Sequence, residues 1–274
     1  MSIILITAIF AASLAFVLGV TLGFFRDFFA VPEDPITANI RAVLPGANCG
    51  ACGYPGCEIF AAEVAKGNVQ ASACTAISLS AMKKIAAITG VDGGEVVQTV
   101  VALACLGSSI HTPLKGSYTG IPTCWGAKIA GGTKLCAWGC LGFGDCVRVC
   151  KFDALGTNVY DLPRVNYSKC TGCGLCVSEC PQKLFKKIAR NQKGALVLCS
   201  NVNPIKKMVT DACKISCFKC GQCVKNCPEQ CINMETLLPV VDYTKCTSCG
   251  NCVIKCPTKV IKIIERDMLN APST

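Results

Sequence analysis

The chain begins with a long apolar run. Ile3 to Phe25 carries no charged residue. At ~1.5 Å per residue, such a run forms a helix of about 34 Å, long enough to cross a bilayer. A cleaved signal peptide is the alternative, but only Met1 and Ser2 precede the run, so a basic start is missing. The pattern therefore predicts a retained single-pass anchor over residues 1–30.

Beyond this run the hydrophobic pattern changes between short helices and short strands. Apolar residues recur at helical spacing in the segments 36–44, 58–66 and 76–89. The segments 96–104 and 195–199 are instead β-branched and apolar, which predicts buried strands. The chain is therefore expected to combine small helical and small β elements.

Cysteine is the residue that changes this picture, with 25 copies among 274 residues. Three stretches, beginning at Cys170, Cys217 and Cys246, share the spacing C-x-x-C-x-x-C-x-x-x-C-P. In bacterial two-cluster ferredoxins, three cysteines of such a run bind one [4Fe–4S] cluster and the fourth binds another. Disulfides need no such spacing, and zinc ribbons need neither the third cysteine nor the proline. The spacing predicts iron–sulfur clusters in a reducing compartment, because the thiolates must stay available as ligands.

A fourth copy of the run lacks its second cysteine, because Phe143 stands there. Cys136, four residues before Cys140, is the obvious substitute. With the fourth cysteine of each run assigned to the neighbouring cluster, the spacing predicts four ligand sets. They are Cys136, Cys140, Cys146 and Cys180; Cys150, Cys170, Cys173 and Cys176; Cys217, Cys220, Cys223 and Cys256; and Cys227, Cys246, Cys249 and Cys252.

The two ferredoxin modules form an internal repeat. Cys136 recurs 77 residues later as Cys213, and LPRVNYSKC recurs 76 residues later as LPVVDYTKC. Because Cys220 fills the position that Phe143 leaves vacant, Cys213 is expected to be spare. A Cys213→Ala variant should then keep every cluster, whereas Cys136→Ala should lose one. The predicted boundaries are 136–190 and 213–264 for the modules, 191–212 for their linker and 265–274 for a loose tail.

A different cysteine pattern lies in residues 31–95, which we predict to be a four-iron domain. PGANCGACGYPGC allows backbone turns at its glycines, and four cysteines are what one further [4Fe–4S] cluster requires. These four are Cys49, Cys52, Cys57 and Cys74. Five sets use twenty cysteines. Cys105 and Cys124, in the connecting segment 96–135, are interpreted as buried thiols rather than as ligands of an extra site. The other unassigned cysteines are Cys199, Cys213 and Cys231.

The formal net charge of +10 could indicate nucleic-acid binding. Five clusters on twenty thiolates would add roughly −10 and leave the loaded protein near neutral. The lysines beside the cysteines are therefore interpreted as offsetting cluster charge or guiding an acidic partner. The chain has no P-loop or GxGxxG motif, and its single histidine, His111, has no acid–base partner in the pattern. Neither a nucleic-acid partner nor catalytic residues are expected.

An apolar N-terminal segment, PGANCGACGYPGC, CLGFGDCVRVC and ferredoxin runs follow one another in this chain. In this combination the chain resembles the B subunits of Rnf complexes over essentially its whole length. The resemblance implies an α+β fold with an N-terminal transmembrane helix, a small mainly helical four-iron domain and two tandem bacterial two-cluster ferredoxin-like modules. It also implies a subunit that carries electrons only, within an ion-translocating ferredoxin:NAD+ oxidoreductase.

The same resemblance implies partners and a location. Reduced soluble ferredoxin would supply the electrons, a flavoprotein subunit would deliver them to NAD+, and membrane subunits would move Na+ or H+. Arg26 and Arg41 follow the apolar run and no Lys or Arg precedes it, which favours the plasma membrane with the modules on the cytoplasmic side. The alternatives are an electron-transfer subunit of another membrane dehydrogenase or hydrogenase, and a redox sensor or cluster carrier.

Overall fold

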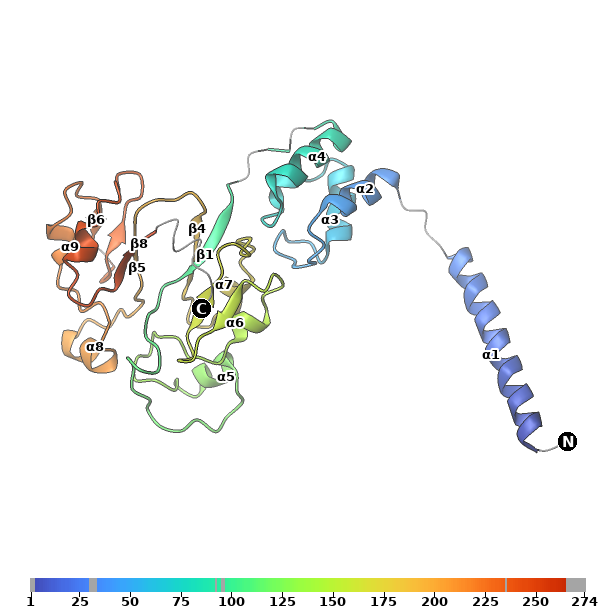
Figure 1. Ribbon diagram of the computed structural model, residues 1–274, viewed down its shortest axis with the longest axis horizontal. Coiled ribbons are helices and arrows are strands. Elements are labelled where there is room, and N and C mark those ends of the chain that lie inside the picture. The colour runs from blue at the N-terminus through green and yellow to red at the C-terminus, as the bar shows by residue number, and fades with distance from the viewer. Residues whose placement is uncertain (1–2, 30–33, 92, 95–96, 235, 265–274) are drawn as a thin grey trace.

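The computed structural model describes residues 3–29, 34–91, 93–94, 97–234 and 236–264. Along these residues the chain forms an apolar helix that stands apart, then a small helical domain, then two modules of short antiparallel strands (Figure 1). The predicted tail, 265–274, lies outside the described residues. The observed order of elements agrees with the predicted anchor followed by iron–sulfur domains.

Helix α1 (Ile3–Phe28) is apolar on all sides. Its segment Leu5–Arg26 has a mean hydropathy of 2.4, and none of it is buried against the rest of the protein. In the described part of the chain it is the one helix long and apolar enough to cross a membrane. A helix that is hydrophobic all round is stable when it is surrounded by protein or lipid. Because no protein covers α1, its length and composition support the predicted anchor.

The helical domain comprises α2 (Pro35–Val43), α3 (Cys57–Ala65), the 3₁₀ turn η1 (Ala71–Ala73) and α4 (Leu79–Thr89). Ile40, Phe60 and Ile85, at most 1% exposed, form its core. The Asp34 carboxylate caps α2 by accepting two backbone N–H groups. The predicted helix 76–89 begins three residues late, because the Ser78 hydroxyl accepts the backbone N–H of the first turn and fixes the start there.

The first module is closed by its first and last strands. Its elements are β1 (Thr99–Leu103), α5 (Cys124–Ile129), α6 (Asp145–Arg148), β2 (Leu155–Thr157), β3 (Pro163–Val165), α7 (Leu175–Glu179) and β4 (Phe185–Ala189). β1 pairs antiparallel with β4, and β2 with β3. The predicted strand at 96–104 is confirmed as β1. It comes from the segment expected to be a connection, and it completes the module.

The second module repeats this plan. Its elements are β5 (Ala195–Val197), α8 (Lys206–Ala212), α9 (Gln222–Lys225), β6 (Ile232–Asn233), β7 (Val240–Val241), α10 (Asn251–Ile254) and β8 (Ile261–Ile263). β5 pairs antiparallel with β8, and β6 with β7. Val101 and Ile188 of the first module belong to the same buried cluster as Leu196 and Ile261 of the second. The two modules therefore share one hydrophobic core and lie side by side (Figure 1).

Four short helices each begin directly after a glycine with a left-handed backbone, which side chains with a Cβ adopt only at a cost. The glycines are Gly144, Gly174, Gly221 and Gly250, with φ between 73° and 88°. In every case the second residue of the helix is a cysteine about 6% exposed. These cysteines, the third of each run, are Cys146, Cys176, Cys223 and Cys252. The local backbone thus aims one thiol of each run into the module interior.

Candidate metal centres

Five cavities of similar size are each lined by at least four cysteines and contain about 290 to 370 Å³ not filled by protein atoms. Site A is lined by Cys124, Cys140, Cys146 and Cys180; site B by Cys150, Cys170, Cys173 and Cys176; site C by Cys217, Cys220, Cys223 and Cys256; site D by Cys227, Cys246, Cys249 and Cys252, with Cys231 beside them; and the bridging cavity by Cys105, Cys136, Cys199 and Cys213. Three of these cavities, sites B, C and D, contain predicted sets.

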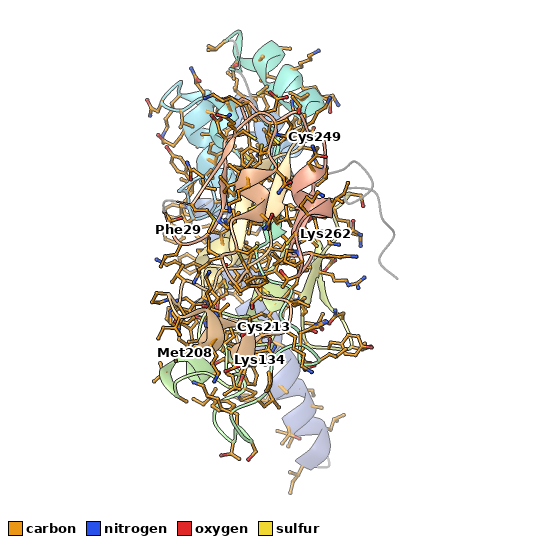
Figure 2. All side chains as sticks on the ribbon, turned by 90° about the vertical axis from the view of Figure 1, so that its left-hand side faces the viewer. Phe29, Lys134, Met208, Cys213, Cys249 and Lys262 are labelled. Atoms are coloured by element: carbon orange, nitrogen blue, oxygen red, sulfur yellow. The ribbon has the colours of Figure 1, made fainter. Side chains whose placement is uncertain are left out.

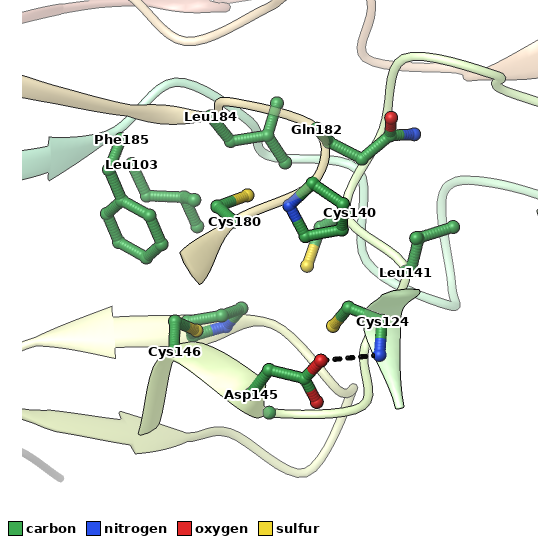
Figure 3. Close-up of a pocket in the computed structure, with 13 residues that line it drawn as sticks. Leu103, Cys124, Cys140, Leu141, Asp145, Cys146, Cys180, Gln182, Leu184 and Phe185 are labelled. Carbon is green, nitrogen blue, oxygen red and sulfur yellow. Dashed lines mark hydrogen bonds between the residues drawn. The ribbon is translucent and has the colours of Figure 1, made fainter. Parts of the chain in front are cut away.

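Site A differs from its predicted set by one cysteine. Figure 3 shows the sulfur atoms of Cys124, Cys140, Cys146 and Cys180 around one space. Cys124 reaches it from the start of α5, where its backbone N–H donates to the Asp145 carboxylate at 2.8 Å. The predicted fourth ligand, Cys136, lines the bridging cavity instead. Although it stands only four residues before Cys140, Cys136 therefore lies at a different cavity from Cys140. Cys124 supplies the fourth thiol of site A, in place of the cysteine that the run lacks at Phe143.

A sixth group of cysteines lies in the N-terminal helical domain. Cys49, Cys52 and Cys57 come from the loop before α3 and from its first residue, and Cys74 ends the η1 turn. Burial raises the pKa of Cys74, and charge on the other three thiols raises it further, so all four are neighbours. The Asn48 side-chain oxygen accepts the Cys57 backbone N–H at 2.8 Å and holds the loop against α3. We call this group the N-terminal site; it is the predicted four-iron set.

Site B is held close to the strand that completes its module. Gly172, between Cys170 and Cys173, has φ of 68°, and a Cβ there would lie 2.2 Å from the Thr99 hydroxyl oxygen. The equivalent residue in the second module is Ser248, which adopts a similar φ of 61°. Only glycine therefore fits at position 172, because the loop touches β1.

The cavities fit a cluster better than a single ion. In the described residues, no group of three or more His, Cys, Asp or Glu side chains is arranged to hold one metal ion, as a zinc site would need. A [4Fe–4S] cluster binds each thiolate at a different iron, so the sulfurs stay apart. Four buried hydroxyls with no hydrogen-bond partner in the protein lie beside the cysteines and can donate to cluster sulfur. They belong to Thr75, Thr112, Thr171 and Ser248.

The charges also suit an anionic group. Burial raises the pKa of Cys140, Cys146 and Cys176 to about 12, so bare thiolates are disfavoured there until iron compensates their charge. Lys134 is 3% exposed, its ammonium donates to the Gly107 carbonyl at 3.4 Å, and its charge lowers the Cys140 pKa. No carboxylate pairs with Lys134 among the described residues. A buried cation needs a counter-charge, and four thiolates on a [4Fe–4S] cluster supply one.

The six groups follow one another in a row. Cysteine charges that raise the pKa of a thiol, after the larger effect of burial, identify neighbouring groups. Such effects link site D to site C, site C to the bridging cavity, the bridging cavity to site A, site A to site B, and site B to the N-terminal site. The bridging cavity thus stands between the two modules, and the row ends at the N-terminal site, in the helical domain that follows α1.

One cysteine of site D lies at the surface. Cys249 is the one exposed cysteine among the 25 of the chain, and Figure 2 shows it at the end of the molecule formed by the second module. Exposed lysines occupy the same module: Lys255 and Lys259 flank Cys256 of site C, and Lys262 lies on β8. A protein partner that approaches the second module therefore meets positive charge and an exposed cysteine.

Cys231 is the cysteine outside every set of four. Its sulfur lies 3.4 Å from that of Cys227. In the first module the equivalent residue is Ala154. Its carbonyl accepts the Asn166 N–H at 2.7 Å, just as the Cys231 carbonyl accepts the N–H of Asp242, the repeat equivalent of Asn166, at 2.7 Å. The fold therefore needs a small buried residue here, not a thiol.

Family models match three parts of the chain. Residues 44–76 match the model described as "Putative Fe-S cluster", residues 163–184 match "4Fe-4S binding domain", and residues 216–263 match "4Fe-4S dicluster domain". None of these three models covers residues 77–162, where Cys105, Cys124 and Cys136 lie.

Curated relatives match most of the chain. The B subunit of the Na(+)-translocating ferredoxin:NAD(+) oxidoreductase complex of Acetobacterium woodii is 39% identical over 84% of this chain and 68% of its own length. The B subunit of the ion-translocating oxidoreductase complex of Methanosarcina acetivorans is 34% identical over 89% of this chain and 93% of its own length. The B subunit of the proton-translocating ferredoxin:NAD(+) oxidoreductase complex of Clostridium ljungdahlii is 33% identical over 88% of this chain and 85% of its own length.

Proposed function

This chain belongs to the family of B subunits of ion-translocating ferredoxin:NAD(+) oxidoreductase (Rnf) complexes, and on that premise we propose that it takes electrons from reduced ferredoxin and passes them toward the membrane subunits. It is an iron–sulfur electron-transfer subunit of such a complex, with several 4Fe-4S domains. When bound, a [4Fe–4S] cluster accepts and returns one electron. The cysteines of sites A to D and of the N-terminal site would hold five clusters, with Cys124 in place of Cys136 at site A.

The observation that carries this proposal is the row of cysteine sites from exposed Cys249 to the N-terminal site. Ferredoxin would dock on the second module, which carries the exposed Cys249 of site D and exposed lysines that attract an acidic protein. The electrons would leave at the N-terminal site, which is tethered to α1 in the membrane, toward a flavoprotein subunit and NAD+. The modules would face the cytoplasm, since Arg26 follows the apolar segment.

The docking proposal is tested by charge reversal in the whole complex. Lys255→Glu with Lys259→Glu should raise the KM for ferredoxin about tenfold at low salt and leave kcat unchanged, because surface charges act mainly on encounter. The difference should fade as salt rises. Lys83→Glu with Lys84→Glu, on exposed positions of α4, is the matched control. An unchanged KM, or an equal effect of the control, would show that ferredoxin docks elsewhere.

Membrane orientation is tested with vesicles. Protease added to inside-out vesicles should digest the modules, whereas intact right-side-out vesicles should protect them. The opposite pattern would place the modules outside the cytoplasm.

A further inference from the structure

We propose that Cys105, Cys136, Cys199 and Cys213 bind a further [4Fe–4S] cluster between the two ferredoxin modules, as a sixth site of this chain. Neither the ferredoxin runs nor the matched family models assign these four residues to one site. The proposal does not depend on ferredoxin being the electron donor, because it concerns what these residues hold.

The four cysteines surround one cavity and are shielded from water. All are between 5% and 8% exposed, and the cavity contains about 310 Å³, the same as that of site B. Four converging thiols are the complement that one cluster requires. Every cysteine in the chain is free of a disulfide, and no arrangement for a single ion is present in the described residues.

The cavity is built from two equivalent halves. Cys105 follows β1 and Cys199 follows β5. Just before them, the Ala104 N–H donates to the Leu184 carbonyl at 2.7 Å and the Leu198 N–H donates to the Val260 carbonyl at 2.9 Å, each next to the partner strand. Cys136 and Cys213 each stand four residues before the first cysteine of their run. Each module therefore contributes the same pair of thiols, and this gives Cys213 a place although Cys220 completes its own run.

Hydrogen-bond donors surround the sulfurs, as they do at iron–sulfur centres. The Gly107 N–H lies 3.4 Å from the Cys105 sulfur, and the Cys217 N–H lies 3.4 Å from that of Cys199. The Asn201 amide reaches across from the second module to the Cys136 sulfur at 3.6 Å. These donors stabilise thiolate sulfur on both sides of the cavity.

Two more features leave room for a bound group. The Thr112 hydroxyl, on a residue 1% exposed, lines the cavity without any partner. Gly107 also lines it, and a Cβ there would lie 3.4 Å from the Cys213 sulfur and 2.9 Å from the Thr112 hydroxyl. A cluster sulfide would give Thr112 its acceptor, and the missing Cβ keeps that space open.

Six sets of four use every cysteine except Cys231, which provides the control. The experiment counts iron, zinc and acid-labile sulfide in the full chain, purified in detergent without oxygen, and records EPR during reduction. The wild type should contain about 24 irons rather than about 20. Cys213→Ser and Cys136→Ser should each lose about four irons and the same EPR signal, and the double variant should lose no more. Cys231→Ala, which copies Ala154, should lose none.

Thr112→Val keeps the shape of the site and removes only the hydroxyl, so it should retain all iron and shift the EPR signal that Cys213→Ser removes. If Cys213→Ser disrupts the whole protein, the iron count of the wild type and the EPR signal of Thr112→Val still test the proposal. About 20 irons in the wild type, full iron in Cys213→Ser, an unshifted spectrum in Thr112→Val, or one zinc per chain would each overturn the proposal.

Discussion

Asp145 positions the cysteine of site A that has no place in a ferredoxin run. Its carboxylate is 6% exposed and accepts the Cys124 backbone N–H at 2.8 Å (Figure 3). It also pairs with Arg148. Asp145→Ala removes this acceptor and leaves a half-buried N–H unpaired. We expect the loop that carries Cys124 to open more often as a result.

The size of the effect follows from these contacts. A hydrogen bond to a charged group contributes about 1.5–3 kcal/mol. The Arg148 side chain is 57% exposed, so its ion pair adds at most about 1 kcal/mol. A loss of about 2 kcal/mol corresponds to roughly thirtyfold weaker holding of the site A cluster. Asp145→Asn keeps an acceptor oxygen and should lose less than Asp145→Ala.

The assay is iron release from the full chain into excess chelator, without oxygen. Asp145→Ala should release about four irons roughly ten to a hundred times faster than the wild type, and the remaining irons at the usual rate. Arg148→Met keeps the carboxylate and is the matched control, with a release rate within about fivefold of the wild type. Unchanged release from Asp145→Ala, or an equal effect of Arg148→Met, would refute the role of Asp145 and weaken the assignment of Cys124.

Three other predictions follow from single contacts. Gly172→Ala should lose the site B cluster and lower the melting temperature, because its Cβ would collide with Thr99. Gly250→Ala, whose Cβ would have nothing within 4 Å, should lower stability by only about 1 kcal/mol. Equal iron contents in the two variants would contradict the collision. Deletion of residues 1–29 should release the chain from membranes and leave its iron content unchanged, as membrane fractionation and iron analysis would show. A truncated chain still bound to lipid would exclude α1 as the sole anchor. Asp34→Ala should destabilise α2 by about 1 kcal/mol, seen as faster hydrogen exchange of its first-turn amides, and unaltered exchange would argue against the cap.

The sequence predicts local features of this protein well. The spacing within Cys170–Cys180 and Cys246–Cys256 determines how each loop folds, because a left-handed glycine and a one-turn helix place the thiols without help from distant residues. The apolar run and the helices of the N-terminal domain follow from short-range patterns in the same way.

The division of Cys124 and Cys136 between two sites could not be predicted in this way. Cys124 lies sixteen residues before Cys140 in no fixed motif, and its position depends on the bond to Asp145. Cys136 turns toward the second module, where Asn201 meets it. The available signal was the repeat itself, since Cys105 and Cys199 follow equivalent strands, just as Cys136 and Cys213 precede equivalent runs.

The pairing of first strand with last strand in each module has a consequence for biogenesis. β1 must wait for β4 and β5 must wait for β8, so a module cannot close until its final residues have left the ribosome. Translation proceeds from the N-terminus, and domains fold in that order. The first module therefore closes while the second is still being made. The bridging cavity draws half of its thiols from each module, and Cys199 follows β5, which pairs with β8. It therefore cannot be complete before the second module closes, so the iron–sulfur assembly machinery would meet it only on a nearly finished chain.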